Sequence, residues 1–69
     1  MKWIRTKEQV PEMEQVVCVI LKPHNLIKTA HRCMPWPVTE EVYWNVDTVG
    51  LIPEQYGTVA YWCELPPIP

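Results

Sequence analysis

The sequence contains no phenylalanine and no serine, and only two of its 69 residues are glycine. The missing serine excludes a serine nucleophile, and two glycines cannot form a glycine-rich loop of the kind that holds phosphate groups. The aromatic residues are instead four tryptophans and three tyrosines. Their N–H and O–H groups need water or a partner when they are buried. Such rings suit a thin domain in which few positions lie far from solvent.

The sequence also lacks a run of basic residues. Six lysines and arginines stand against eight aspartates and glutamates, which gives a formal net charge of −2. Non-specific binding of nucleic acid needs several clustered cations to neutralise phosphates, so no nucleic-acid partner is expected. A protein partner that is basic, or that presents a flat surface of mixed polarity, fits this composition better.

No hydrophobic run is long enough to cross a membrane. The longest is Val16–Leu21, whereas a spanning helix needs about 20 apolar residues. Residues Met1–Val10 lack the apolar core of a signal peptide. We therefore expect a cytoplasmic protein with no membrane partner, folded as one domain over residues 1–69. A chain of this length buries only about 60% of its unfolded surface, so its core must be dense.

Eight prolines divide the chain into short intervals, and none of these carries a long helical repeat. Alternating and β-branched residues between them predict a mainly β fold, a small single-domain antiparallel meander of about four strands. One short helical turn is expected, at Thr6–Glu8 or Pro53–Tyr56. Asp47–Gly57 is interpreted as a long connection and residues 65–69 as an extended proline-rich tail. The four predicted strands are Gln15–Lys22, Leu26–Cys33, Glu41–Val46 and Thr58–Glu64.

The strands also carry face predictions. The first is apolar on both faces, which predicts a central strand covered on both sides. In the second, Ala30 and Arg32 point away from the face that holds His31 and Cys33, because neighbours on a strand alternate. In the third, Trp44 and Val46 share a face opposite Tyr43. In the fourth, Val59, Tyr61 and Cys63 are expected on one face.

Both ends of the chain resemble a known family. The sequence opens with Trp3-Ile4, reaches Pro11-Glu12 before the run Val16–Leu21, and closes with Trp62 followed by Leu65-Pro66-Pro67. These features resemble a family of short phage and prophage proteins, domain of unknown function 551. The family tail usually reads Thr-His-Trp-Met-Pro-Leu-Pro. Here Ala60 and Tyr61 replace its Thr and His, and Cys63 and Glu64 replace its Met and Pro, so no role for that histidine carries over.

The resemblance covers about half the chain and implies a bacterial or phage origin. It brings no activity with it. Small phage proteins of this kind often act on host or competitor machinery, so the resemblance implies an accessory protein that binds another protein, with inhibition of a host or defence protein as its concrete form.

Residue types suited to zinc occur without the spacing that zinc sites use. No Cys-x-x-Cys pair is present. With no secretion signal, free thiols are the expected state of the three cysteines. No metal or cofactor is predicted, and a small zinc-binding domain remains an alternative. The candidate ligands would be Cys18, His24, His31, Cys33 and Cys63.

Catalysis has one candidate pair, because His31 and Cys33 share a predicted strand face. A nucleophile also needs an oxyanion site and a pocket, and a four-strand meander offers little room for them. Glu40 and Glu41 are neighbours on the chain and would point to opposite faces. We therefore expect a protein that is not an enzyme.

Partner binding has a clearer candidate. Trp36 stands between Pro35 and Pro37, where a central strand cannot form, and tryptophan is enriched at binding hot spots. We predict a partner-binding site of Trp36, Tyr43, Pro35 and Pro37, with burial of Trp36 over the core as the alternative. Strand Glu41–Val46 carries charge only at its start, so it is the candidate edge for a homodimer or a self-associating structural protein.

Overall fold

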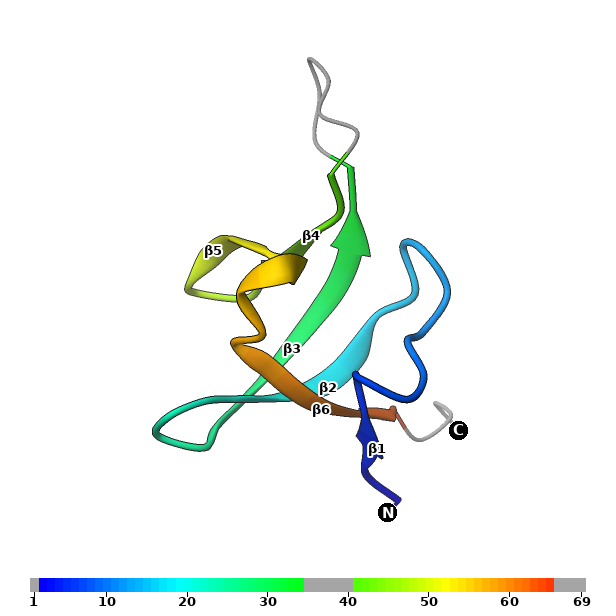
Figure 1. The fold of residues 1–69 in the computed structure, drawn as a ribbon, viewed down its shortest axis with the longest axis vertical. Coiled ribbons are helices and arrows are strands. Elements are labelled where there is room, and N and C mark those ends of the chain that lie inside the picture. The colour runs from blue at the N-terminus through cyan, green and yellow to red at the C-terminus, as the bar shows by residue number, and fades with distance from the viewer. Residues whose placement is uncertain (1, 35–40, 66–69) are drawn as a thin grey trace.

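The computed structural model describes residues 2–34 and 41–65 and shows the mainly β fold that the sequence predicts. Six antiparallel strands form one open sheet in the order β1-β6-β2-β3-β4-β5 (Figure 1). A single turn of 3-10 helix, η1 (Glu54–Tyr56), lies between the last two strands. No helix in this part of the chain is long and apolar enough to cross a membrane. The strands are β1 (Ile4–Arg5), β2 (Val17–Leu21), β3 (Leu26–Cys33), β4 (Tyr43–Val46), β5 (Gly50–Pro53) and β6 (Val59–Glu64).

The sheet has two more strands than expected. Strand β3 has its predicted bounds, and β2, β4 and β6 lie inside theirs. Strand β1 was not predicted, and β5 occupies the segment interpreted as a long connection. A tight turn joins β4 to β5, in which Val49 N–H donates to the Val46 carbonyl at 3.1 Å and Thr48 adopts a φ of 65°. The helical turn η1 lies within Pro53–Tyr56, the second of the two segments predicted to form one.

The missed strand β5 also overturns a prediction about the sheet edge. Strand β4 pairs with β3 on one side and with β5 on the other. Because both of its backbone edges are used, β4 cannot be the edge that pairs with a second copy. Among the described residues the edges are β1 and β5.

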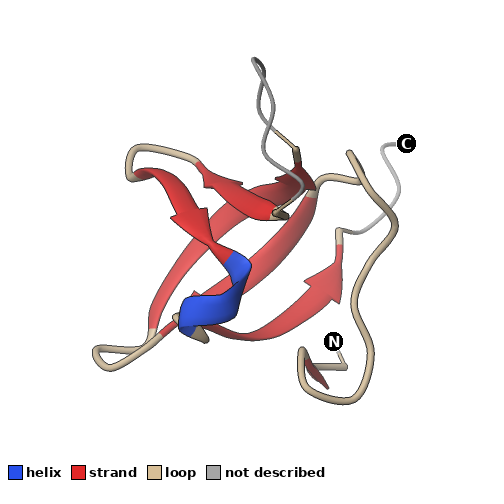
Figure 2. Ribbon diagram, turned by 45° about the horizontal axis from the view of Figure 1, so that its top comes forward, coloured by secondary structure: helices blue, strands red, loops and turns tan. Residues whose placement is uncertain are grey.

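The short connection between β5 and β6 forces the sheet to curl. In the sheet order these strands are four spacings apart, which is about 19 Å in a flat sheet. Only residues 54–58 join them, and three of these form η1, where each residue rises only about 2 Å. The connection reaches only if β5 folds back towards β6, and Figure 2 shows the helical turn η1 bridging the two strands that it connects.

The core fills the inner face of this curl. Strand β2 alternates between buried and half-buried positions, with Val17, Val19 and Leu21 on the inner face. Its other face, which carries Cys18 and Ile20, is only partly covered, so the prediction of a strand covered on both sides is wrong. The curl explains the difference, because the core cluster fills its concave side. The remaining inner core residues are Ala30, Trp44, Val46, Val59 and Trp62.

A β-bulge changes the faces of β6. Tyr61 lies opposite Ile20, but Val59 lies opposite Leu21, so Ala60 is an extra residue on this strand. The extra residue turns Val59 to the inner face with Trp62, while Tyr61 and Cys63 stay on the other face. The prediction that Val59 shares a face with Tyr61 and Cys63 is therefore wrong.

The segment between β1 and β2 crosses one end of the core and is held by side chains of other strands. Trp62 Nε1 donates to the Gln9 carbonyl at 2.9 Å, and Arg32 Nη1 donates to the Pro11 carbonyl at 2.9 Å. Arg32 also contacts Glu54 of η1 through two bonds, Nε–Oε2 at 2.6 Å and Nη2–Oε1 at 3.3 Å. Arg32 therefore joins β3, η1 and the amino-terminal segment.

We expect Arg32→Met to lower the free energy of unfolding by about 1–3 kcal/mol, because it removes charge-assisted hydrogen bonds and leaves Glu54 without this partner. Urea unfolding followed by tryptophan fluorescence measures the change. Lys28→Met is the matched control, since Lys28 makes one exposed bond, to Thr48 Oγ1. Equal midpoints for Arg32→Met and the unmodified protein would contradict the assigned role.

Candidate functional site

The predicted partner-binding residues divide into two groups. Pro35, Trp36 and Pro37 lie outside the described residues, so the predicted anchor remains a prediction. Tyr43 begins β4 and is half-buried, with Cys33 opposite it on β3 and Pro53 opposite it on β5. The structure therefore places Tyr43 on the sheet face that points away from the core.

This face, which we call the outer face, is where side chains of several strands gather without a covering layer among the described residues. Its aliphatic members include the most exposed of the large hydrophobic residues on strands, Ile27 at 62% and Leu51 at 51%. The pairing register of β2 to β5 defines the set as Cys18, Ile20, Ile27, Thr29, His31, Cys33, Tyr43, Asn45, Leu51 and Pro53.

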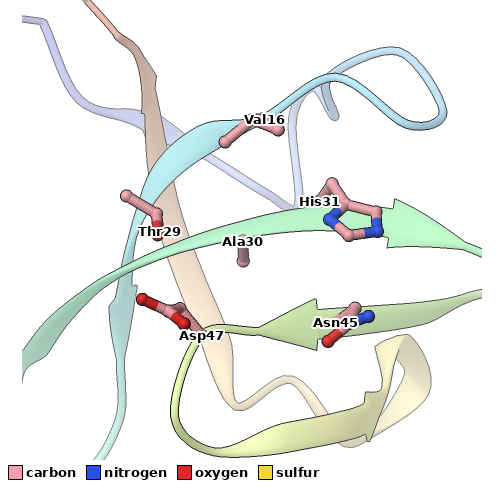
Figure 3. A pocket seen from close by; sticks show the side chains of 6 residues that line it. All are labelled: Val16, Thr29, Ala30, His31, Asn45 and Asp47. Carbon is pink, nitrogen blue, oxygen red and sulfur yellow. The ribbon is translucent and has the colours of Figure 1, made fainter.

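An open hollow of about 220 Å³ lies on the outer face between β3 and β4. His31 and Asn45 are directly opposite each other in the register and lie side by side in Figure 3. Val16, just before β2, borders one side, and Asp47, just after β4, borders another (Figure 3). Polar side chains thus form most of the lining of the hollow, and Val16 is the large aliphatic side chain at its margin.

The backbone around the hollow is held by hydrogen bonds. Asp47 N–H donates to the Thr29 carbonyl at 2.9 Å, which continues the β3–β4 ladder one residue beyond β4. On the other side, Glu14 N–H donates to the Arg32 carbonyl at 2.9 Å, and Glu14 Oε2 lies 3.7 Å from His31 Nε2. The hollow therefore has two carboxylates at its margins, on a frame fixed by strand pairing.

The His31 and Cys33 pair does not have the features of an activated nucleophile. Both residues lie on the outer face, as predicted. Burial raises the pKa of the Cys33 thiol, and the nearby carboxylate of Glu14 raises it further. A higher pKa lowers the fraction of thiolate, which is the reactive form. The environment of Cys33 therefore opposes nucleophilic chemistry.

The candidate zinc ligands do not assemble in the part of the chain that the structure describes. No group of three or more His, Cys, Asp or Glu side chains there could hold a metal ion. Cys18 and Cys63 lie directly opposite each other on β2 and β6, and all three cysteines are free thiols. These two thiols would supply only two of the four ligands of a tetrahedral zinc site.

Sequence reasoning missed most of the hollow. Asn45 and Asp47 are ordinary polar residues at a strand end, and Val16 was assigned to a central strand. The signal available was alternation, which correctly placed His31 on the face opposite Ala30. Alternation does not predict which strand pairs with β3. His31 lies beside Asn45 because of the β3–β4 register, which depends on pairing between separate parts of the chain.

The pKa of the buried Cys63 thiol predicts how stability changes with pH. Burial raises this pKa, and the adjacent Cys18 raises it further. The unfolded chain ionises at the ordinary thiol value of about 8.5, so stability is full below that pH and falls as pH rises through it. We expect Cys63→Ala to show a shallower decline of unfolding free energy between about pH 8 and pH 10. Urea titrations across that range measure it, and identical slopes for the two proteins would contradict the assignment.

Comparison with known proteins finds no matching family model, no matching curated protein and no matching solved structure. The resemblance of the two chain ends to domain of unknown function 551 therefore stays a prediction. The function must be argued from the fold and from the outer face.

Proposed function

We propose that this protein acts by binding another protein through the outer face of its sheet. The observation that carries this proposal is the set of half-exposed aliphatic side chains around a polar hollow. Val16, Ile27 and Leu51 each expose half or more of their surface, and they come from three different strands or strand ends. Aliphatic groups mixed with hydrogen-bonding side chains are typical of interfaces between proteins that also exist apart.

The size of the outer face bears on how the partner binds. Four strands about 4.8 Å apart and about 20 Å long present roughly 400 Å². A standard interface buries about 800 Å² on each partner. The partner must therefore also contact segments that border the face.

Two exposed methionines border it at the end of β3. Met34 directly follows β3, and Met13 precedes Glu14, whose N–H is bonded to the Arg32 carbonyl. Methionine side chains adapt their shape to a partner surface. We assign both methionines to the binding surface, together with the predicted anchor Trp36.

The two carboxylates at the margins of the hollow favour a partner that places a basic group near it. Glu14 and Asp47 flank His31 and Asn45, whereas no lysine or arginine lines the hollow. Opposed charges at a rim raise the rate of association and fix orientation more than they raise affinity. The resemblance of the chain ends to phage proteins supports a partner in the bacterial cytoplasm, with inhibition of a host or defence protein as the outcome.

Self-association is the second candidate, and the free edge of β5 favours it. In the described residues β5 pairs only with β4, so its other backbone edge is open. The edge is only four residues long and ends in Pro53, which has no N–H to donate. These features limit how many hydrogen bonds a second copy could form there.

We expect Ile27→Glu to abolish capture of the partner, because it places a charge at the most exposed aliphatic side chain of the outer face. Tagged protein incubated in bacterial lysate, with bound proteins identified by mass spectrometry, measures the effect. Val49→Glu is the matched control, since Val49 is 51% exposed and lies in the β4–β5 turn. A protein retained by Val49→Glu and lost with Ile27→Glu supports the proposal.

Equal retention by both variants would contradict binding through the outer face. Light scattering of the purified chain tests the second candidate function, self-association through the β5 edge. A stable dimer that Leu51→Pro converts to a monomer with an unchanged circular dichroism spectrum would favour the β5 edge instead.

A further inference from the structure

Positive charge gathers at one place on this acidic protein, in a cleft of about 270 Å³ that we call the cation cleft. Arg5, Lys7 and Lys22 line it, which is half of the six lysines and arginines in the chain. No aspartate or glutamate is among its lining residues. The other lining residues are Thr6, Gly57, Ala60 and Tyr61.

The fold brings these cations together from distant parts of the chain. Strand β1 pairs with β6 so that Arg5 lies opposite Tyr61. The next residue, Thr6, is held against β6 because its Oγ1 donates to the Val59 carbonyl at 2.8 Å. Lys22 follows β2, and its N–H donates to the Thr58 carbonyl at 2.8 Å. The convergence therefore depends on the same strand pairing that builds the sheet.

The charges of the cleft are not neutralised within the described part of the protein. None of Arg5, Lys7 and Lys22 forms an ion pair there. The Lys22 ammonium donates to Asn25 Oδ1 at 2.6 Å and stands 5.7 Å from the centre of the Tyr61 ring. Like charges held near one another repel, and a bound anion removes that repulsion.

The neighbouring surface points to an extended ligand. A second hollow shares Arg5 and Tyr61 with the cation cleft and adds Lys2 and Trp3, together with one carboxylate, Glu8. Two hollows joined through shared residues fit a chain of several units better than a single small anion. Lys22 also occupies one face of the Tyr61 ring, which leaves less of the ring for stacking by a nucleobase.

We propose that the cation cleft binds an acidic peptide segment of a protein partner. Its carboxylates accept hydrogen bonds from Arg5, Lys7 and Lys22, and its apolar stems pack on Tyr61 and Ala60. This site does not rest on the proposed function, because the cleft can take such a segment whether or not the outer face binds a protein.

The test is a titration of the full chain with fluorescein-labelled hexaglutamate at low salt, followed by fluorescence anisotropy. We expect Arg5→Gln and Lys22→Gln, each made singly so that one charge is removed, to weaken binding at least fivefold. Lys28→Gln is the matched control, because Lys28 is a cation outside the cleft that bonds Thr48, and it should change affinity less than twofold. Amide NMR shifts on unmodified protein should be confined to residues 2–9, 22 and 57–61.

Three results would overturn the proposal. Equal weakening by Lys28→Gln would show attraction by general charge alone. Displacement of the peptide by inorganic phosphate at an equal concentration of charge would reassign the cleft to a small anion. Tighter binding of a hexathymidylate strand than of hexaglutamate would reassign it to single-stranded nucleic acid.

Discussion

The short connection between β5 and β6 is the constraint on which the rest of the structure depends. Residues 54–58 join strands that stand four positions apart in the sheet, so the sheet has to curl. Curling creates the concave side that Trp44, Trp62 and the β2 valines fill. It also brings η1 within reach of β3, where Arg32 binds Glu54. The described residues thereby gain a core without a long helix or a disulfide.

The same curl determines which surfaces remain for function. One side of β2 to β5 is filled by the core, and the other becomes the outer face. The amino-terminal segment is used to cover the end of the core, where Gln9 and Pro11 accept bonds from Trp62 and Arg32. Two carboxylates lie at the margins of the hollow, and three cations line the cleft around β6. Charges of opposite sign are thus gathered at two separate places.

The sequence predicted those features of the fold that depend on a single strand, and it missed features whose residues are also typical of turns. Alternation correctly placed Trp44 and Val46 on one face of their strand and His31 on the face opposite Ala30, because period-two patterns depend only on the strand itself. Strand β5 was missed because its four residues begin with Gly50 and end with Pro53, which are typical of turns. Missing β5 then made β4 look like an edge strand.

Long-range features had no comparable signal. The extra residue at Ala60 leaves no mark in a run that still reads as a strand, so the inward turn of Val59 was not foreseen. The pair of Arg32 and Glu54 joins residues 22 positions apart, and the cation cleft joins both ends of the chain. Such groupings depend on pairing between strands that lie far apart in the sequence, such as β1 with β6, and local patterns do not specify which distant strands pair.

The central claim is that the outer face is uncovered in the free protein and therefore available to a partner. Relaxation of methyl NMR signals by a soluble gadolinium chelate tests it directly. The account expects strong relaxation at Ile27, Leu51 and Val16, and weak relaxation at the buried Val17 and Val19. Protection of Ile27 and Leu51 as complete as that of Val19 would contradict it, because the outer face would then already be covered in the free protein.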